Sequence, residues 1–252
     1  MDFLRALSLL VVVVWHWVFS VIIWHSDGPH ASNPIATTRG FWVLTWLLQV
    51  MPVFFFVGGY AHLRTWQSLH RDGGGYGAFV RRRLGRLMGP TALCLAIFLV
   101  VRVVLAFALP DVEWITRGLI LLLSPMWFLG VYVLLVLLAP LTIRAHERLG
   151  ELVPVALVGG VVWVDLLRFH FDVPTAAWLN MVFVWALIHQ LGYWYEQLAK
   201  APRTTAAALA LGGLIGLSAF TNMGLYPRSM VGVPGESYSN MGPPTLEKEA
   251  PP

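Results

Sequence analysis

The sequence predicts an all-α fold, a polytopic transmembrane helical bundle of about seven spans. Of its 252 residues, 58% are hydrophobic and only 12% are charged. A chain of this length with so few charged side chains cannot cover a water-soluble globule with polar surface. Long apolar stretches recur along the chain and alternate with short polar connections. These observations together favour a membrane-embedded bundle over a soluble fold.

Each predicted span is an apolar stretch long enough to cross about 30 Å of hydrocarbon as a helix. We expect these stretches to form one transmembrane domain, residues 1–221, followed by a Pro- and Gly-rich extracytoplasmic tail, residues 222–252. Pairs of glycines, such as Gly58-Gly59 and Gly212-Gly213, predict places where helices approach closely. The predicted spans are 6–24, 41–62, 91–109, 126–143, 152–168, 177–194 and 205–221.

The charge of the connections predicts the orientation of the bundle in the cell membrane. Most lysines and arginines fall in connections on the side of the N-terminus, so this side is cytoplasmic by the positive-inside rule. An odd number of spans then places the C-terminus outside. The same asymmetry accounts for the net charge of +4, so we expect the lipid bilayer, and no nucleic acid, as a partner. A single cysteine, Cys94, excludes an intrachain disulfide, and the histidines lack the spacing of a metal pair, so we predict no metal site.

Two ionisable residues of the first span are candidates for a catalytic role. Arg5 and His16 are eleven positions apart, so their side chains leave one face of a helix about 16 Å apart along its axis. Arg5 then lies at the membrane edge and His16 near mid-membrane, where an ionisable residue is costly and is a functional candidate. Histidine, with an ordinary pKa of about 6.5, is the usual general base near neutral pH. The plainer alternatives are a buried histidine satisfied by a serine or a backbone carbonyl, and an arginine that anchors the span.

The arginine-rich run RRRLGR, residues 81–86, follows the second span and has two interpretations. As an orientation signal it would meet anionic lipid headgroups, which is common at a cytoplasmic membrane edge. As a functional element it would hold phosphate, because the planar guanidinium fork matches phosphate oxygens bidentately. Among the other polar residues of the spans, His189 and Gln190 would line a cavity or pack in the core.

Four motifs in order along the chain carry a resemblance to a known family. The chain resembles the acyltransferase 3 family of integral membrane O-acyltransferases, by motif over the first four spans and by hydropathy over the remainder. Each motif alone is weak, and their order on the expected elements makes the resemblance specific. The motifs are Arg5 with His16, the stretch MPVFFFVGGY at 51–60, Arg82-Arg83-Leu84-Gly85-Arg86 with Pro90, and Trp127-Phe128-Leu129.

The resemblance implies transfer of an acyl group, often acetyl, from cytoplasmic acyl-CoA to a hydroxyl of a sugar or other cell-envelope acceptor. Acetyl-CoA would be a co-substrate, with no bound cofactor. His16 would correspond to the essential intramembrane histidine and act as general base, with a covalent acyl-histidine as the less favoured variant. Arg5 would be its paired arginine, which holds the donor or stabilises negative charge on the thioester oxygen.

The resemblance also implies a donor-binding group on the cytoplasmic side. The cytoplasmic arginine motif would be Arg82, Arg83 and Arg86, and Trp127 would join these arginines in binding the donor. Members of the family have more spans than this chain, so we interpret it as a C-terminally truncated member. A non-catalytic helper subunit and a transporter remain as alternatives, although the sequence has no evident internal repeat and few acidic residues in its spans.

Overall fold

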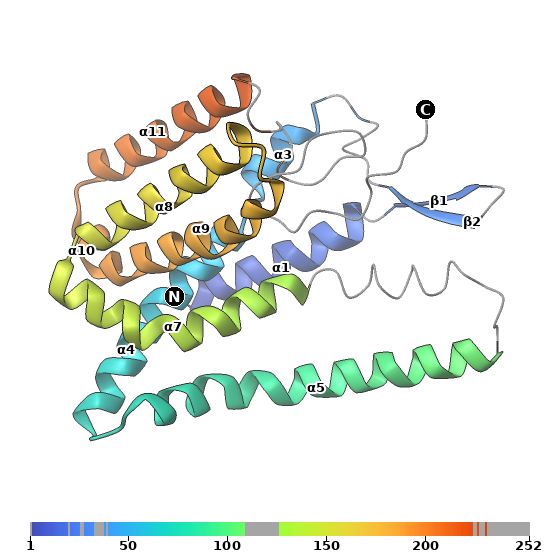
Figure 1. Ribbon diagram of the computed structural model, residues 1–252, viewed down its shortest axis with the longest axis horizontal. Coiled ribbons are helices and arrows are strands. Elements are labelled where there is room, and N and C mark those ends of the chain that lie inside the picture. The colour runs from blue at the N-terminus through green and yellow to red at the C-terminus, as the bar shows by residue number, and fades with distance from the viewer. Residues whose placement is uncertain are drawn as a thin grey trace. The chain divides into compact units, whose positions relative to one another are not determined.

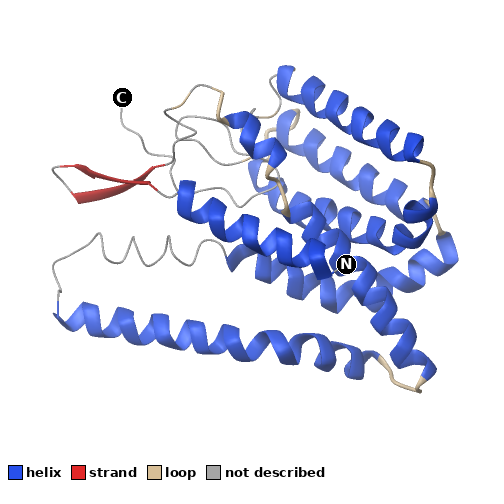
Figure 2. Cartoon of the chain, turned by 180° about the vertical axis from the view of Figure 1, so that it is seen from behind, coloured by secondary structure: helices blue, strands red, loops and turns tan. Residues whose placement is uncertain are grey.

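The structure is a computed structural model that describes residues 2–19, 21–25, 28–32, 38, 40–108, 126–223, 226 and 230. Nearly all of these residues are helical (Figure 1, Figure 2), which confirms the predicted all-α bundle. Most of the predicted tail lies outside the described residues. The chain divides into two compact units, one of Met1–Ile23, Ala31–Tyr60 and Ala145–Pro252, the other of Trp24–His30 and Ala61–Arg144.

The first predicted span is shorter than expected. Helix α1 (Asp2–Phe19) ends at Phe19, and the chain enters a short β-hairpin of strands β1 (Val21–His25) and β2 (Gly28–Ser32). β1 opens with three β-branched residues in a row, whose restricted side-chain rotamers favour extended over helical backbone. The prediction of a helix through residue 24 is therefore wrong. His16 lies in the last turn of α1, not near the middle of a span.

Five helical segments in the described residues are long and apolar enough to cross a membrane. The first combines α3 (Trp42–Leu47) with α4 (Met51–Arg71). Pro52 has no N–H for the preceding turn, which fits the start of a new helix here. The other four are α5 (Tyr76–Ala108), α7 (Trp127–Leu149), α8 (Leu152–Phe169) and α11 (Arg203–Asn222).

Two of the predicted spans correspond to helical segments that are too short to be among these five. The apolar stretch of α1, Ala6–Val18, is one of them. The other is the sixth predicted span, where α9 (Ala177–Leu191) has 15 residues and gives way to tighter 3-10 geometry. The prediction of a transmembrane helical bundle is thus confirmed. The described residues contain five long apolar helices, fewer than the about seven spans predicted. The short elements around α9 are η2 (Pro174–Ala176), η3 (Gly192–Trp194) and α10 (Tyr195–Lys200).

The core of the first unit lies where α4 and α9 meet. The rings of Phe55 and Trp185, both almost fully buried, have centroids 4.6 Å apart. Close approach of the two helices depends on Gly59, because a Cβ atom there would overlap the carbonyl oxygen of His189. Gly212, in contrast, has open space around it, so the predicted close contact is found at Gly59 and not at Gly212.

The second unit contains the C-terminal part of α4, all of α5, and α7 as far as Arg144. A tight turn joins α4 to α5, and Gly73 adopts a positive φ of 75° in it, a conformation that suits glycine. Phe79 is fully buried and meets the rings of Trp66 and His62 edge to face. The most apolar stretch of α5 has no buried residue, as expected for a helix surface that faces lipid. This packing brings the start of α5, with Arg83, against α4.

Candidate functional site

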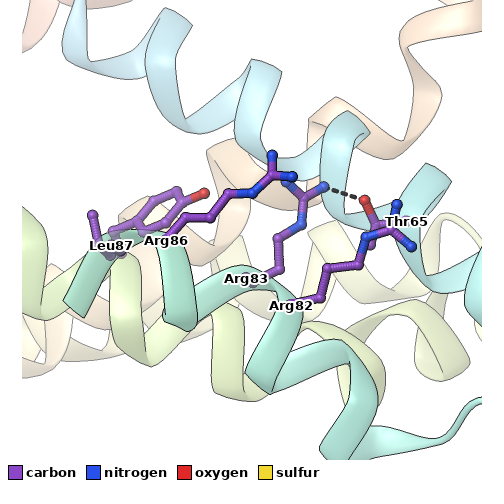
Figure 3. A pocket seen from close by; sticks show the side chains of 6 residues that line it. Thr65, Arg82, Arg83, Arg86 and Leu87 are labelled. Carbon is purple, nitrogen blue, oxygen red and sulfur yellow. Dashed lines mark hydrogen bonds between the residues drawn. The ribbon is translucent and has the colours of Figure 1, made fainter. Parts of the chain in front are cut away.

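A cavity of about 370 Å³ lies within the second unit, at the arginine-rich start of α5. Its volume falls in the range of small-molecule sites. Figure 3 shows the arginine side chains extending from α5, with the Arg83 guanidinium reaching Thr65 of α4. We call this space the arginine cavity, and its lining residues are Thr65, Arg82, Arg83, Arg86, Leu87 and Tyr132.

Arg83 differs from the other two arginines of the cavity. Its guanidinium donates to the carbonyl oxygen of Ala61 and to the hydroxyl oxygen of Thr65, both on α4. The Thr65 hydroxyl in turn donates to the same Ala61 carbonyl at 2.8 Å. Arg83 is half-buried, whereas Arg82 and Arg86 are exposed. Arg83 therefore fastens α5 to α4, a contact that sequence reasoning did not predict.

Arg82 and Arg86 are four residues apart in α5, and both line the arginine cavity. Residues four apart on a helix are neighbours on one face, so these two guanidinium groups leave α5 together. The described residues that line the cavity include three arginines and no acidic side chain, so its lining is strongly cationic. Guanidinium forks bind phosphate oxygens bidentately, so this arrangement suits a phosphorylated ligand.

A buried histidine contacts one of the residues that line the arginine cavity. His62 of α4 has no exposed surface, and its Nε2 lies 3.1 Å from the hydroxyl oxygen of Tyr132, a lining residue on α7. The spacing of the histidines was interpreted only in terms of metal binding, so this contact of His62 was not predicted from the sequence. A histidine inside an apolar span, three residues before Thr65, was the available signal. No group of three His, Cys, Asp or Glu side chains suited to a metal ion occurs in the part of the chain that the structure describes.

His16 has a defined hydrogen bond in the first unit. Its Nδ1 lies 2.7 Å from the carbonyl oxygen of Val12, one turn earlier in α1. A carbonyl oxygen only accepts, so Nδ1 carries the proton, and in the neutral ring Nε2 presents its lone pair. The imidazole is exposed. The alternative of a buried histidine satisfied by a backbone carbonyl is thus right about the partner and wrong about burial.

The remaining predicted site residues have these positions. Arg5 lies in α1 on the same side of the helix as His16, by the eleven-residue spacing, and its side chain is outside the described residues. Trp127 is the first residue of α7 and is half-buried. It is not among the described residues that line the arginine cavity.

His189 and Gln190 are core residues rather than the lining of a cavity. Their exposed fractions are 2% and 1%. The Tyr193 hydroxyl lies 3.3 Å from His189 Nδ1, and Gln190 Nε2 lies 3.2 Å from His146 Nδ1. Each residue thus has a hydrogen-bond partner for one side-chain nitrogen within the first unit. The sequence had left two alternatives for this pair, lining a cavity or packing in the core. Their burial favours packing in the core.

The helical bundle, the cationic cavity and the oriented histidine define a polytopic membrane protein equipped to bind an anionic ligand. The sequence profile of the acyltransferase 3 family, described as an acyltransferase domain, matches residues 1–246. The chain therefore belongs to this family and is a membrane acyltransferase in general terms. No match is found among the curated proteins or among the solved structures.

Proposed function

We propose that the protein is a membrane O-acyltransferase that transfers an acyl group, acetyl in the simplest case, from cytoplasmic acyl-CoA to a hydroxyl group. The acceptor would be a sugar or another component of the cell envelope. The observation that carries this proposal is the arginine cavity, because a coenzyme A donor brings phosphate groups that need cationic partners. Membership of the family supports acyl transfer, and the cationic lining of the cavity supports a phosphorylated donor.

The donor would be held mainly by Arg82 and Arg86, whose exposed guanidinium groups extend from one face of α5. Arg83 would contribute positive charge while its hydrogen bonds hold α5 against α4. Trp127 would supply a further contact to the donor. The excess of basic residues around α5 supports a cytoplasmic position for this end of the bundle, with the N-terminus on the same side and the C-terminus outside.

His16 would act as the general base. As the acceptor oxygen attacks the thioester carbonyl carbon, its proton moves to Nε2, a carbon–oxygen bond forms and the carbon–sulfur bond breaks. The proton then passes from the imidazolium to the departing thiolate, which leaves as CoA thiol. The Nδ1 hydrogen bond to Val12 supports this role because it leaves Nε2 as the basic nitrogen. Arg5, on the same side of α1, would stabilise negative charge that develops on the thioester oxygen.

The test measures donor binding and thiol release by the full chain in lipid nanodiscs. We expect acetyl-CoA to bind, and CoA thiol to appear faster when an acceptor from a panel of envelope sugars is added. The Arg82→Ala/Arg86→Ala double variant should bind acetyl-CoA at least tenfold more weakly, the loss expected for charge-assisted hydrogen bonds. Arg81→Ala is the matched control, since Arg81 belongs to the same run but is not a lining residue.

Three results would contradict the proposal. Equal acetyl-CoA affinity in the double variant and in Arg81→Ala would remove the arginine cavity as the donor site. Folded wild-type protein that binds no acetyl-CoA would favour a non-catalytic helper subunit, and solute flux into liposomes without thiol release would favour a transporter.

A further inference from the structure

One face of α5 continues from the arginine cavity into the apolar part of the helix. Residues four, seven or eleven positions apart lie on the same face of a helix. Counted from Arg82, this spacing selects Arg86, Gly89 and Leu93, all within α5. The face therefore passes from guanidinium groups to an apolar surface within about three turns.

The apolar part of this face is open to the membrane. Leu93 is exposed, and so are Ile97 and Val100, which continue the same face in the next turns. The most apolar stretch of α5 contains no buried residue. In a helix that spans a membrane, such a surface lies against the alkyl chains of lipids.

The arginines and the apolar surface are spaced as the parts of a phospholipid are. Arg86 and Leu93 are seven residues apart, about 10 Å along the helix axis. The headgroup layer of a bilayer is about 5–8 Å thick in each leaflet. When Leu93 lies at the edge of the hydrocarbon, the guanidinium groups therefore lie near the level of the lipid phosphates. Between them, Gly89 has open space around it.

The charge of the site selects an anionic lipid. Arg82 and Arg86 are exposed, and the described residues that line the arginine cavity include no acidic side chain. Guanidinium groups bind phosphate oxygens bidentately. A zwitterionic phospholipid carries a cationic group next to its phosphate, which the arginines repel, whereas an anionic phospholipid carries none.

We propose that the headgroup phosphate of an anionic phospholipid binds in the arginine cavity, on Arg82 and Arg86, with its alkyl chains along the face of α5 that contains Leu93. The lipid occupies the same guanidinium groups as a phosphorylated donor, so the two compete. Only this competition rests on the proposed function. It makes acyl transfer sensitive to the anionic lipid content of the leaflet that surrounds the cavity.

Binding of phosphatidylglycerol to the full chain tests the proposal. The measurement is a lipid titration by native mass spectrometry in neutral detergent micelles, where no charged bilayer attracts or repels the probes. The Arg82→Ala/Arg86→Ala double variant should bind phosphatidylglycerol at least tenfold more weakly than the wild type, because charge-assisted hydrogen bonds are lost. Arg71→Ala/Arg81→Ala is the matched control, since it removes two exposed arginines of the same unit that do not line the cavity.

Two further measurements separate a lipid from a soluble phosphate ester. Phosphatidylglycerol should displace acetyl-CoA from the wild type at concentrations at least tenfold lower than sn-glycerol 3-phosphate, which has the phosphate but no alkyl chains. Leu93→Asn should weaken phosphatidylglycerol binding, because its chains lose an apolar contact. Leu99→Asn is the control for this variant, since Leu99 is also exposed but lies on another face of α5.

Each outcome decides the proposal separately from the proposed function. Equal phosphatidylglycerol affinity in the two double-arginine variants would overturn the inference, and so would equal affinity in Leu93→Asn and Leu99→Asn. Displacement of acetyl-CoA by glycerol phosphate as effectively as by the lipid would overturn the lipid and leave the cavity as a site for soluble phosphates. Binding of phosphatidylglycerol that depends on Arg82 and Arg86, without any binding of acetyl-CoA, would sustain the lipid site and overturn the coenzyme A donor.

Discussion

The Nδ1 atom of His16 lies 2.7 Å from the carbonyl oxygen of Val12, and this single contact determines which nitrogen of the ring is basic. Because the partner is a carbonyl oxygen, the proton stays on Nδ1 and Nε2 accepts. The same logic orients histidines that bind metals or act as bases, where the second nitrogen is fixed by a backbone or carboxylate partner. Helix α1 thus supplies both the imidazole and the group that orients it.

The first prediction concerns His16. His16→Ala should lower acceptor-dependent thiol release by about 10²- to 10⁴-fold, the usual contribution of a general base, while the affinity for acetyl-CoA stays unchanged. The measurement pairs single-turnover thiol release with equilibrium binding. His170→Ala serves as control, because His170 is also exposed and lies at the end of α8. An equal rate in His16→Ala and His170→Ala would remove His16 from the reaction.

The second prediction concerns how much each arginine of the cavity contributes to the stability of the protein. Arg83→Ala should lower the free energy of unfolding by about 1–3 kcal/mol, because the Ala61 carbonyl and the Thr65 hydroxyl lose a charged partner. Arg82→Ala and Arg86→Ala, at exposed positions, should change it by less than about 0.5 kcal/mol. Unfolding in mixed micelles gives these values. An equal loss of stability in all three variants would contradict the distinction between Arg83 and the two exposed arginines.

The third prediction concerns helix contact in the first unit. Gly59→Ala should destabilise the protein by about 1–3 kcal/mol, because the added methyl group overlaps the His189 carbonyl oxygen and forces α4 and α9 apart. Gly212→Ala, made in open space on α11, should be neutral or stabilising by up to about 1 kcal/mol. Thermal unfolding of the two variants side by side is the measurement, and the same sign of change in both would be inconsistent with this packing.

The fourth prediction concerns a polar contact inside the bundle. Asn180 of α9 is fully buried and donates its side-chain N–H to Asp165 Oδ1 of α8 at 2.7 Å, and the Tyr226 hydroxyl donates to Oδ2 of the same carboxylate. A double-mutant cycle with Asn180→Leu and Asp165→Leu should give a coupling energy above about 0.5 kcal/mol, because each substitution leaves the other residue without this partner. Additive effects would show that the two residues stabilise the fold independently.

The fold was predictable from the sequence where apolar length alone decides it. The long apolar stretches behind α5, α7, α8 and α11 give helices of the expected kind, because no other backbone satisfies its own hydrogen bonds in hydrocarbon. The end of α1 was not predictable in the same way. A run of β-branched residues from Val21 is as apolar as a helical span, and hydropathy does not distinguish a strand from a helix over so few residues.

The candidate site was predictable by residue type and not by partner. The run RRRLGR identified arginines suited to phosphate, yet nothing in the run marked Arg83 as the one bonded to α4, because that bond depends on how α4 and α5 pair. Tyr132 is an ordinary aromatic residue of an apolar helix until its contact with His62 is known. Contacts between residues 70 positions apart in the chain require the tertiary structure.

The chain has one cysteine, and Cys94 is exposed on α5, about 12 Å along the helix axis from Arg86. A thiol reagent that permeates the bilayer will therefore titrate one protein sulfhydryl per chain in addition to any CoA released. Blocking Cys94 beforehand removes this background from the release measurement. The same uniqueness allows a spin label or fluorophore to be attached at a single site without first deleting other cysteines.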